Sequence, residues 1–132
     1  MERVFVDTGA WYALVDQADA DHEAARGWFE ANRPPLVTTD YALHETIALL
    51  RVELGHAPAA TFGEQLRGSR LARLVTVRPD DHEAAWAIFK KCDDQVLSFT
   101  DCRSFAVMKR LGLRRAFTVD SDFRTMGFVK VI

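Results

Sequence analysis

Four acidic residues stand at positions from which their side chains could act on one substrate. Asp7 and Asp120 each follow a short apolar run, Val4-Phe5-Val6 and Phe117-Thr118-Val119, that is typical of a buried strand. Because the carboxyl ends of parallel strands meet at one edge of a sheet, we expect both aspartates in the same crevice. Asp101 begins a predicted helix that leads into the strand before Asp120, and this connection places the start of the helix at the same edge.

Asp101 and Glu45 both belong to helix faces that are otherwise apolar. Asp101 shares its face with Phe105 and Met108, although the helix dipole alone also favours an aspartate in a first turn. Glu45 lies five residues after Asp40, about 7 Å down its predicted helix. Its neighbours on the same face are Tyr41, Ala48, Leu49 and Val52. Since helical side chains lean toward the amino end of a helix, the Glu45 carboxylate can reach back to the crevice.

Carboxylates that meet at one point repel each other, and this repulsion predicts a bound cation. Two carboxylates about 4 Å apart repel by roughly 4 kcal/mol at an effective dielectric near 20. Either one of them has a raised pKa or a cation lies among them. Oxygen ligands without histidine or cysteine favour Mg²⁺ or Mn²⁺. We therefore expect one or two such ions at Asp7, Glu45, Asp101 and Asp120, where they would assist the hydrolysis of a phosphodiester.

The composition is that of an ordinary globular protein with an asymmetric charge. Of the 132 residues, 48% are hydrophobic and 27% are charged, which excludes a disordered chain. No apolar run reaches the roughly 18 residues of a membrane span, and two cysteines cannot form a disulfide framework, so we expect a cytoplasmic protein. Residues 1–66 have a net charge of −7 and residues 67–132 a net charge of +5. This asymmetry favours a polyanionic partner, beside the alternative of an unevenly charged surface without a function.

Short apolar runs alternate with amphipathic stretches along the chain, which predicts an α/β fold with a parallel sheet in a single domain over residues 1–132. The predicted strands cover residues 3–6, 36–38, 74–77, 115–119 and 128–131. The predicted helices cover residues 21–32, 40–54, 59–71, 80–91 and 101–111, with a turn over 122–126. The expected amino-terminal caps are Asp21, the pair Asp80 and Glu83, and Thr100, whereas Gly55 and Gly112 are expected to end two helices.

The four motifs around these acids, taken in order, resemble those of the PIN-domain family, and most closely the VapC-type toxin ribonucleases of bacterial toxin–antitoxin pairs. The motifs are FVDTGAWYAL, LHETIALL, LSFTDCRSFAVMKRLG and FTVDSDFRTMGF, and the resemblance covers essentially the whole chain. It implies a three-layer α/β/α fold with a central parallel sheet and Mg²⁺- or Mn²⁺-dependent endonucleolytic cleavage of RNA. It maps Asp7, Glu45, Asp101 and Asp120 onto the acidic quartet of the family.

The same resemblance implies two protein partners. One is a second copy of the chain, in a homodimer. The other is a cognate antitoxin, a segment of which would lie across the crevice. A groove edged by apolar side chains between the first four helices would suit this antitoxin.

The chain departs from the family pattern at Asp122, where many relatives have histidine. This fifth carboxylate could share a metal ion with Asp120, which we prefer as the site residue because it directly ends its strand. Thr8 and Thr100 adjoin site acids and could support them, with a helix start and a helix cap as their structural alternatives. Candidate contacts to RNA phosphates are Arg103, Arg124, Arg114 and Arg115.

Other functions compete with that of a toxin nuclease. A phosphatase of the haloacid dehalogenase type needs a second aspartate two residues after the first, and this chain has Gly9 there. A response-regulator receiver needs an acid pair at its first strand and a late lysine, and neither is found at those places. Two alternatives stay open, namely a PIN-type RNA-processing nuclease that is not a toxin and a catalytically silent module that binds RNA or a partner. A titration with Mn²⁺ separates the silent module from the enzyme.

Overall fold

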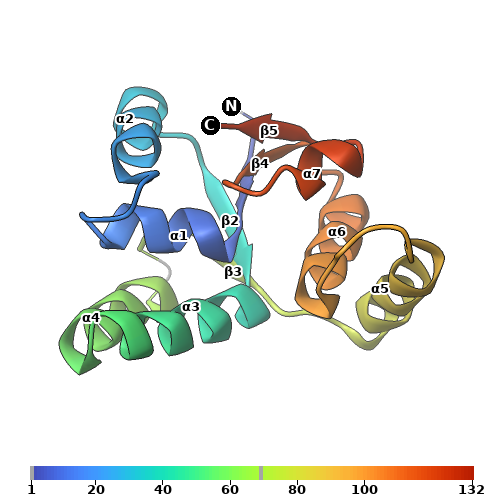
Figure 1. Cartoon of the computed structure of the whole chain (residues 1–132), viewed down its shortest axis with the longest axis horizontal. Coiled ribbons are helices and arrows are strands. Elements are labelled where there is room, and N and C mark those ends of the chain that lie inside the picture. Colours follow the sequence, from blue (N-terminus) through green and yellow to red (C-terminus); the bar gives the residue numbers. More distant parts are fainter. Residues whose placement is uncertain (1, 69) are drawn as a thin grey trace.

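The sheet of this protein consists of parallel strands whose order reverses next to the first strand. The computed structural model describes residues 2–68 and 70–132. Within them, five strands form one sheet in the order β3-β2-β1-β4-β5, and every neighbouring pair is parallel (Figure 1). The strands are β1 (Val4–Val6), β2 (Leu36–Thr39), β3 (Arg73–Val75), β4 (Arg115–Phe117) and β5 (Val129–Val131). The chain moves outward from β1 to β3 and then returns to β4 on the other side of β1, so the switch point lies between β1 and β4.

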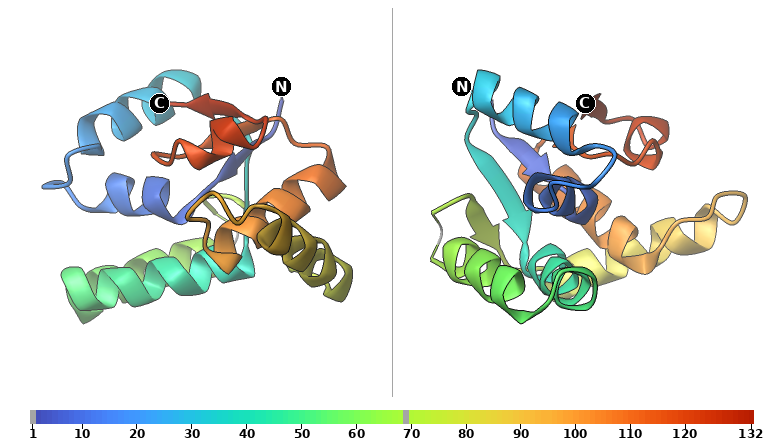
Figure 2. Two further views of the ribbon diagram at one scale, coloured as in Figure 1. Left: turned by 45° about the vertical axis from the view of Figure 1, so that its right-hand side comes forward. Right: turned by 60° about the vertical axis from the view of Figure 1, so that its left-hand side comes forward.

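Helices cover both faces of the sheet and complete the expected three layers. The described residues contain α1 (Thr8–Val15), α2 (His22–Asn32), α3 (Asp40–Glu53), α4 (His56–Arg67), α5 (Pro79–Lys91), α6 (Phe99–Leu111) and α7 (Asp122–Thr125). Helices α1 to α4 lie on one side of the sheet and α5 to α7 on the other (Figure 1). In both views of Figure 2, α3 runs beside α4 and α5 runs beside α6. The predicted α/β/α architecture is confirmed.

The pleat of the strands divides the apolar residues between two cores. Val4 and Val6 of β1 pack into the core beneath α1 to α4, whereas Phe5 packs into the core beneath α5 to α7. In β4, Phe117 belongs to the first core and Ala116 to the second. Both faces of these strands are therefore buried, which is why their sequences are continuously apolar rather than alternating.

Several predicted boundaries are corrected by the structure. Helix α1 was not among the predicted elements, because its sequence TGAWYALV is almost entirely apolar and has no amphipathic period. The helix start considered as the structural role of Thr8 is nevertheless confirmed. Helix α4 begins at His56 rather than near residue 59, since a proline is tolerated in a first turn, where its missing N–H has no helical partner. Strand β4 ends at Phe117 rather than at Val119. The predicted turn over 122–126 contains the short helix α7.

The predicted helix caps were partly wrong. The side chain of Ser98, not that of Thr100, caps α6, because α6 begins two residues earlier than expected. At α5 the Asp81 carboxylate accepts a hydrogen bond from the Arg78 N–H at 2.8 Å, so neither Asp80 nor Glu83 caps this helix. The glycine positions were correct. Gly55 follows α3 with φ at 101°, and Gly112 ends α6 with φ at 68°. Among the helices of the described ranges, none is long and apolar enough to cross a membrane.

Candidate active site

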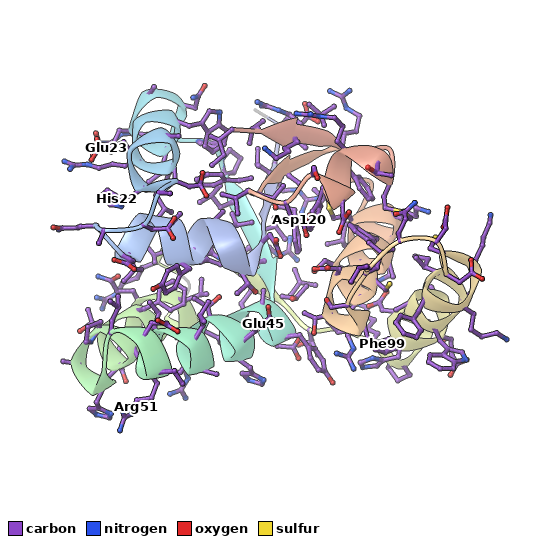
Figure 3. The ribbon with its side chains drawn as sticks, in the orientation of Figure 1. His22, Glu23, Glu45, Arg51, Phe99 and Asp120 are labelled. Atoms are coloured by element: carbon purple, nitrogen blue, oxygen red, sulfur yellow. The ribbon has the colours of Figure 1, made fainter. Side chains whose placement is uncertain are left out.

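Three of the predicted acids meet at the carboxyl edge of the sheet. Carboxylate oxygens of Asp7, Asp101 and Asp120 all lie within 4.8 Å of one another. Asp7 comes directly after β1 and is the residue before α1, and Asp101 lies in the first turn of α6. Asp120 lies on the loop after β4 (Figure 3). The switch point between β1 and β4 therefore brings Asp7 together with Asp120, which is more than a hundred positions away in the sequence.

Thr118 connects two of these aspartates and was not predicted as a site residue. Its hydroxyl donates a hydrogen bond to Oδ2 of Asp7 at 3.1 Å and accepts one from the Asp120 N–H at 3.0 Å. The Thr118 side chain is fully buried. Asp120 in turn accepts a hydrogen bond from the Asp122 N–H at 2.9 Å through Oδ1. A threonine in the short apolar run Phe117-Thr118-Val119, two residues before a site acid, was the signal in the sequence that could have revealed this role.

A reciprocal cap fixes the backbone of Asp101. Its N–H donates to Oγ of Ser98 at 3.0 Å, and its Oδ2 accepts from the Ser98 N–H at 3.4 Å. This is a capping box, in which two otherwise unpaired N–H groups at a helix start are satisfied. Asp101 therefore has both roles considered for it, because it stabilises the first turn of α6 and also lies within the acidic cluster.

The electrostatics of the cluster favour a proton or a cation among the carboxylates. Burial raises the pKa of Asp7 to about 7, with the charges of Asp101 and Asp120 adding to the increase and hydrogen bonds from Thr8 and Thr118 opposing it. Burial also raises the pKa of Asp101, to which the charges of Asp120 and Glu45 contribute. Because burial and neighbouring negative charges oppose the ionisation of Asp7 and Asp101, the cluster that they form with Asp120 binds a positive ion favourably.

Glu45 lies outside the three-aspartate cluster, on the exposed surface of α3 (Figure 3). It is near enough for its charge to raise the pKa of Asp101. The apolar neighbours that suggested a buried helix face are themselves exposed, since Leu49 is 36% and Val52 is 80% accessible. Glu45 is therefore near the three aspartates, as expected. Its exposed helix face shows, however, that apolar neighbours did not indicate burial here.

The structure places the predicted supporting threonines and two of the predicted arginines in different surroundings. Thr8 is buried, and its Oγ1 has no hydrogen-bond partner among the described residues. Thr100 lies in the first turn of α6 and does not cap it. Arg114 pairs with Glu2 at 3.1 Å, and Arg115 begins β4, at the opposite edge of the sheet from Asp120. These two arginines are therefore wrong as candidate contacts to a substrate at the acidic cluster.

Asp122, Arg103 and Arg124 lie on helices that border the acidic cluster. Asp122 begins α7, and burial together with the Asp120 charge raises its pKa. Its side chain does not belong to the three-aspartate group found among the described residues. Arg124 is exposed on α7, and Arg103 is half-buried on α6.

The comparisons with known proteins agree with this geometry. The PIN domain family matches residues 4–129. The chain is 38% identical over 128 residues to the 23S rRNA-specific endonuclease VapC20 of Mycobacterium tuberculosis, in strains CDC 1551 and H37Rv, and the match covers 97% of each chain. It superposes on the crystal structure of M. tuberculosis VapC20, described as a Sarcin-Ricin loop cleaving toxin, with a TM-score of 0.90 at 36% identity and 96% coverage of both chains.

More distant structures share the fold alone. FitAcB from Neisseria gonorrhoeae matches with a TM-score of 0.74 at 14% identity, over 98% of this chain and 96% of that one. A toxin–antitoxin complex from Klebsiella pneumoniae contains a chain that matches with a TM-score of 0.65 at 14% identity, over 89% of this chain and 87% of that one. The chain therefore belongs to the PIN domain family, and within that family to the VapC-like proteins.

Proposed function

We propose that this protein is a divalent-metal-dependent endoribonuclease and the toxin of a toxin–antitoxin pair. The observation that carries the proposal is the convergence of Asp7, Asp101 and Asp120 within 4.8 Å at the switch point of the sheet. The close relative is named as an endonuclease specific for 23S rRNA. We therefore extend the substrate class to this chain, with large-subunit ribosomal RNA as the first RNA to test.

The residues at the cluster fit a hard divalent cation. They offer oxygen ligands only, which favours Mg²⁺ or Mn²⁺ over zinc. The buried Thr8 hydroxyl has no hydrogen-bond partner in the described part of the chain, and a ligand or its water at the cluster would satisfy it. When bound, such an ion stabilises the charge that develops on a scissile phosphate and activates water for attack.

Each acid has a distinct proposed role. Asp7, Asp101 and Asp120 would hold the ion or ions directly, with Thr118 fixing the orientation of Asp7. Glu45 would approach the same ions from α3 with its longer side chain. The raised pKa of Asp7 means that this carboxyl would release a proton when a cation binds near neutral pH.

The test of this proposal is RNA cleavage by the purified protein, with Mn²⁺ or with EDTA. We expect cleavage by the wild type only when the metal is present, and its loss in Asp7→Asn and Glu45→Gln. Asp21→Asn is a matched control, because Asp21 is exposed and its side chain makes no cap hydrogen bond. Equal cleavage by all four proteins with and without EDTA would refute the metal mechanism. Growth arrest when the wild type is induced in cells, but not when Asp7→Asn is induced, tests the toxin assignment separately.

We propose that the antitoxin binds the apolar groove between α1, α2 and α4. This groove has a volume of about 750 Å³ and is lined mainly by apolar side chains, which include Leu14, Val15, Phe29, Phe62 and Leu71. An apolar groove of this kind fits the buried face of a partner helix. The substitution Leu14→Glu would place a charge in the groove, and we expect it to prevent the cognate antitoxin from rescuing growth while RNA cleavage is retained.

The homodimer also stays a prediction. The large apolar side chains that the described surface leaves uncovered include Val52 on α3 and Trp86 and Phe89 on α5, and a second copy could cover them. Sedimentation equilibrium of the wild type and of Trp86→Glu tests this. A dimer that the substitution dissociates would support the prediction, and a wild-type monomer would contradict it.

A further inference from the structure

Arg103 is held in place by aromatic side chains rather than by a carboxylate. Its guanidinium carbon Cζ lies 4.2 Å from the centre of the Tyr41 ring and 4.3 Å from the centre of the Phe99 ring. Its Nε–H donates a hydrogen bond to Nδ1 of His82 at 3.2 Å. The His82 ring also packs edge-on against Tyr41, with ring centres 5.4 Å apart. We call these four residues, from α3, α5 and α6, the arginine clamp.

Three other arginines in the described part of the chain pair with carboxylates. Arg26 pairs with Glu30, Arg110 with Asp81 and Arg114 with Glu2. Arg103 belongs to none of the ion pairs found in residues 2–68 and 70–132, and its charge is balanced by no carboxylate within 4.0 Å there. An arginine that is ordered but lacks an anion is available to bind one.

The chemistry of the clamp restricts what Arg103 can bind. Two rings lie against the guanidinium, so an approaching ligand meets mainly the edge that carries the terminal N–H groups. These groups are donors only, and they match two oxygens of a carboxylate or a phosphate. The clamp therefore favours an anion with paired oxygens.

The clamp lies beside the acidic cluster. Tyr41 precedes Glu45 by one turn on the same face of α3, and the charge of Glu45 raises the pKa of Asp101 on α6, the helix that also carries Arg103. Phe99, at the start of α6, lies on the side of the clamp that is away from α3 (Figure 3). A strand of RNA that is cut at the acids would place its neighbouring phosphates within this border region.

We propose that Arg103 binds a backbone phosphate of the RNA next to the phosphate that is cut, and thereby positions the strand. This proposal rests on the proposed endoribonuclease function. Arg103 is a positioning residue, because it holds the substrate and takes no part in bond breaking. The aromatic rings and His82 keep its guanidinium oriented before the RNA arrives, which reduces the entropy lost on binding.

Arg103→Gln tests the proposal, with Arg51→Gln as a matched control. Both substitutions remove one positive charge, but Arg51 is exposed at the far end of α3 from Glu45 (Figure 3). Cleavage of a single-stranded ribosomal RNA fragment with Mn²⁺ gives KM and kcat. Fluorescence anisotropy with the same fragment in EDTA gives binding without cleavage, and a gel checks that the RNA is intact. Both measurements are repeated over a range of salt concentrations.

For Arg103→Gln we expect KM to rise about tenfold with little change in kcat, as for the loss of one charged hydrogen-bonding contact. The slope of log affinity against log salt should fall by about 0.7, the value for one phosphate contact on a single strand. Arg103→Lys keeps the charge but loses the planar fork, so we expect a slope near that of the wild type and a KM between the other two. This variant also carries the test if Arg103→Gln does not fold.

The two measurements distinguish failure of this proposal from failure of the proposed function. If the wild type cleaves RNA but Arg103→Gln behaves like Arg51→Gln in KM and in salt slope, Arg103 only joins α3 to α5 and α6, and the proposal is wrong. If no protein cleaves but Arg103→Gln still weakens RNA binding more than the control, the nuclease assignment fails and the phosphate contact stands. A wild type that neither binds nor cleaves RNA overturns both.

Discussion

Replacement of Asp7 by asparagine is expected to change the pH dependence of folding stability in the metal-free protein. Asp7 is 8% exposed, and burial raises its pKa from 3.8 to about 7. Between these two pH values the native state keeps a proton that the unfolded state has already released. Stability of the metal-free wild type therefore falls as pH rises through this window, because the native state binds more protons there.

The size of the effect follows from the same two pKa values. A difference of 3.2 between 7 and 3.8 corresponds to about 4 kcal/mol of destabilisation above pH 7, since one pKa unit is worth about 1.4 kcal/mol. At pH 5 this destabilisation is only about 1.6 kcal/mol. The reason is that pH 5 lies only a little more than one unit above the pKa of 3.8 of the unfolded carboxyl, while the native carboxyl is still protonated. The wild type should therefore lose about 3 kcal/mol between pH 5 and pH 8 from Asp7 alone. Asparagine has no charge to bury and should lose none of it.

Urea unfolding in EDTA at pH 5 and pH 8 measures this difference. The free energy of unfolding of Asp7→Asn minus that of the wild type should increase by about 3 kcal/mol from pH 5 to pH 8. Comparing the two proteins at each pH cancels the titration of every group that does not interact with Asp7, and Asp21→Asn should show no such increase. The free energies of unfolding of Asp7→Asn and the wild type could instead differ by the same amount at both pH values. Burial would then not raise the pKa of Asp7, and the electrostatic argument for a cation would fail.

Three further outcomes are expected. Mn²⁺ should raise the unfolding temperature of the wild type at pH 8, and at a hundredfold excess over Kd the added stability is about 2.7 kcal/mol. Mn²⁺ should not raise the unfolding temperature of Asp101→Asn. Calorimetry measures the unfolding temperatures of both proteins. Thr118→Val removes the hydroxyl that joins Asp7 to the Asp120 N–H, so cleavage and Mn²⁺ affinity should fall ten- to a hundredfold, while circular dichroism shows an intact fold. Phe105→Ala should destabilise the protein by about 3–5 kcal/mol in urea, because Phe105 is fully buried and packs 4.9 Å from the Phe123 ring centre.

The sheet and the convergence of three acids could be predicted from the sequence for a topological reason. Parallel strands have their carboxyl ends in common, so two strands that end near aspartates place them together whatever the details of packing. The position of Asp101 followed from the same rule, because its helix had to begin at that edge. These predictions depended on the strands being parallel, which the alternation of apolar runs and helical stretches indicates.

The predictions that failed depended on local packing. Nothing in the period of TGAWYALV distinguishes a helix from a strand, so α1 was missed. The apolar neighbours of Glu45 favoured a helix face shielded from solvent, but only its start is covered, where Tyr41 contacts His82 and Arg103, and Val52 further along is 80% exposed. The cap of α6 was placed two residues late, since both Ser98 and Thr100 are good capping residues and only the backbone decides between them.

The link from Thr118 to Asp7 crosses almost the entire length of the polypeptide. A ribosome that synthesises this protein releases β1 and the first three helices long before β4 is made. The growing chain therefore carries Asp7 for most of its translation without the two aspartates that complete the cluster. The three-aspartate cluster is therefore complete only after β4 and the loop that follows it have packed beside β1.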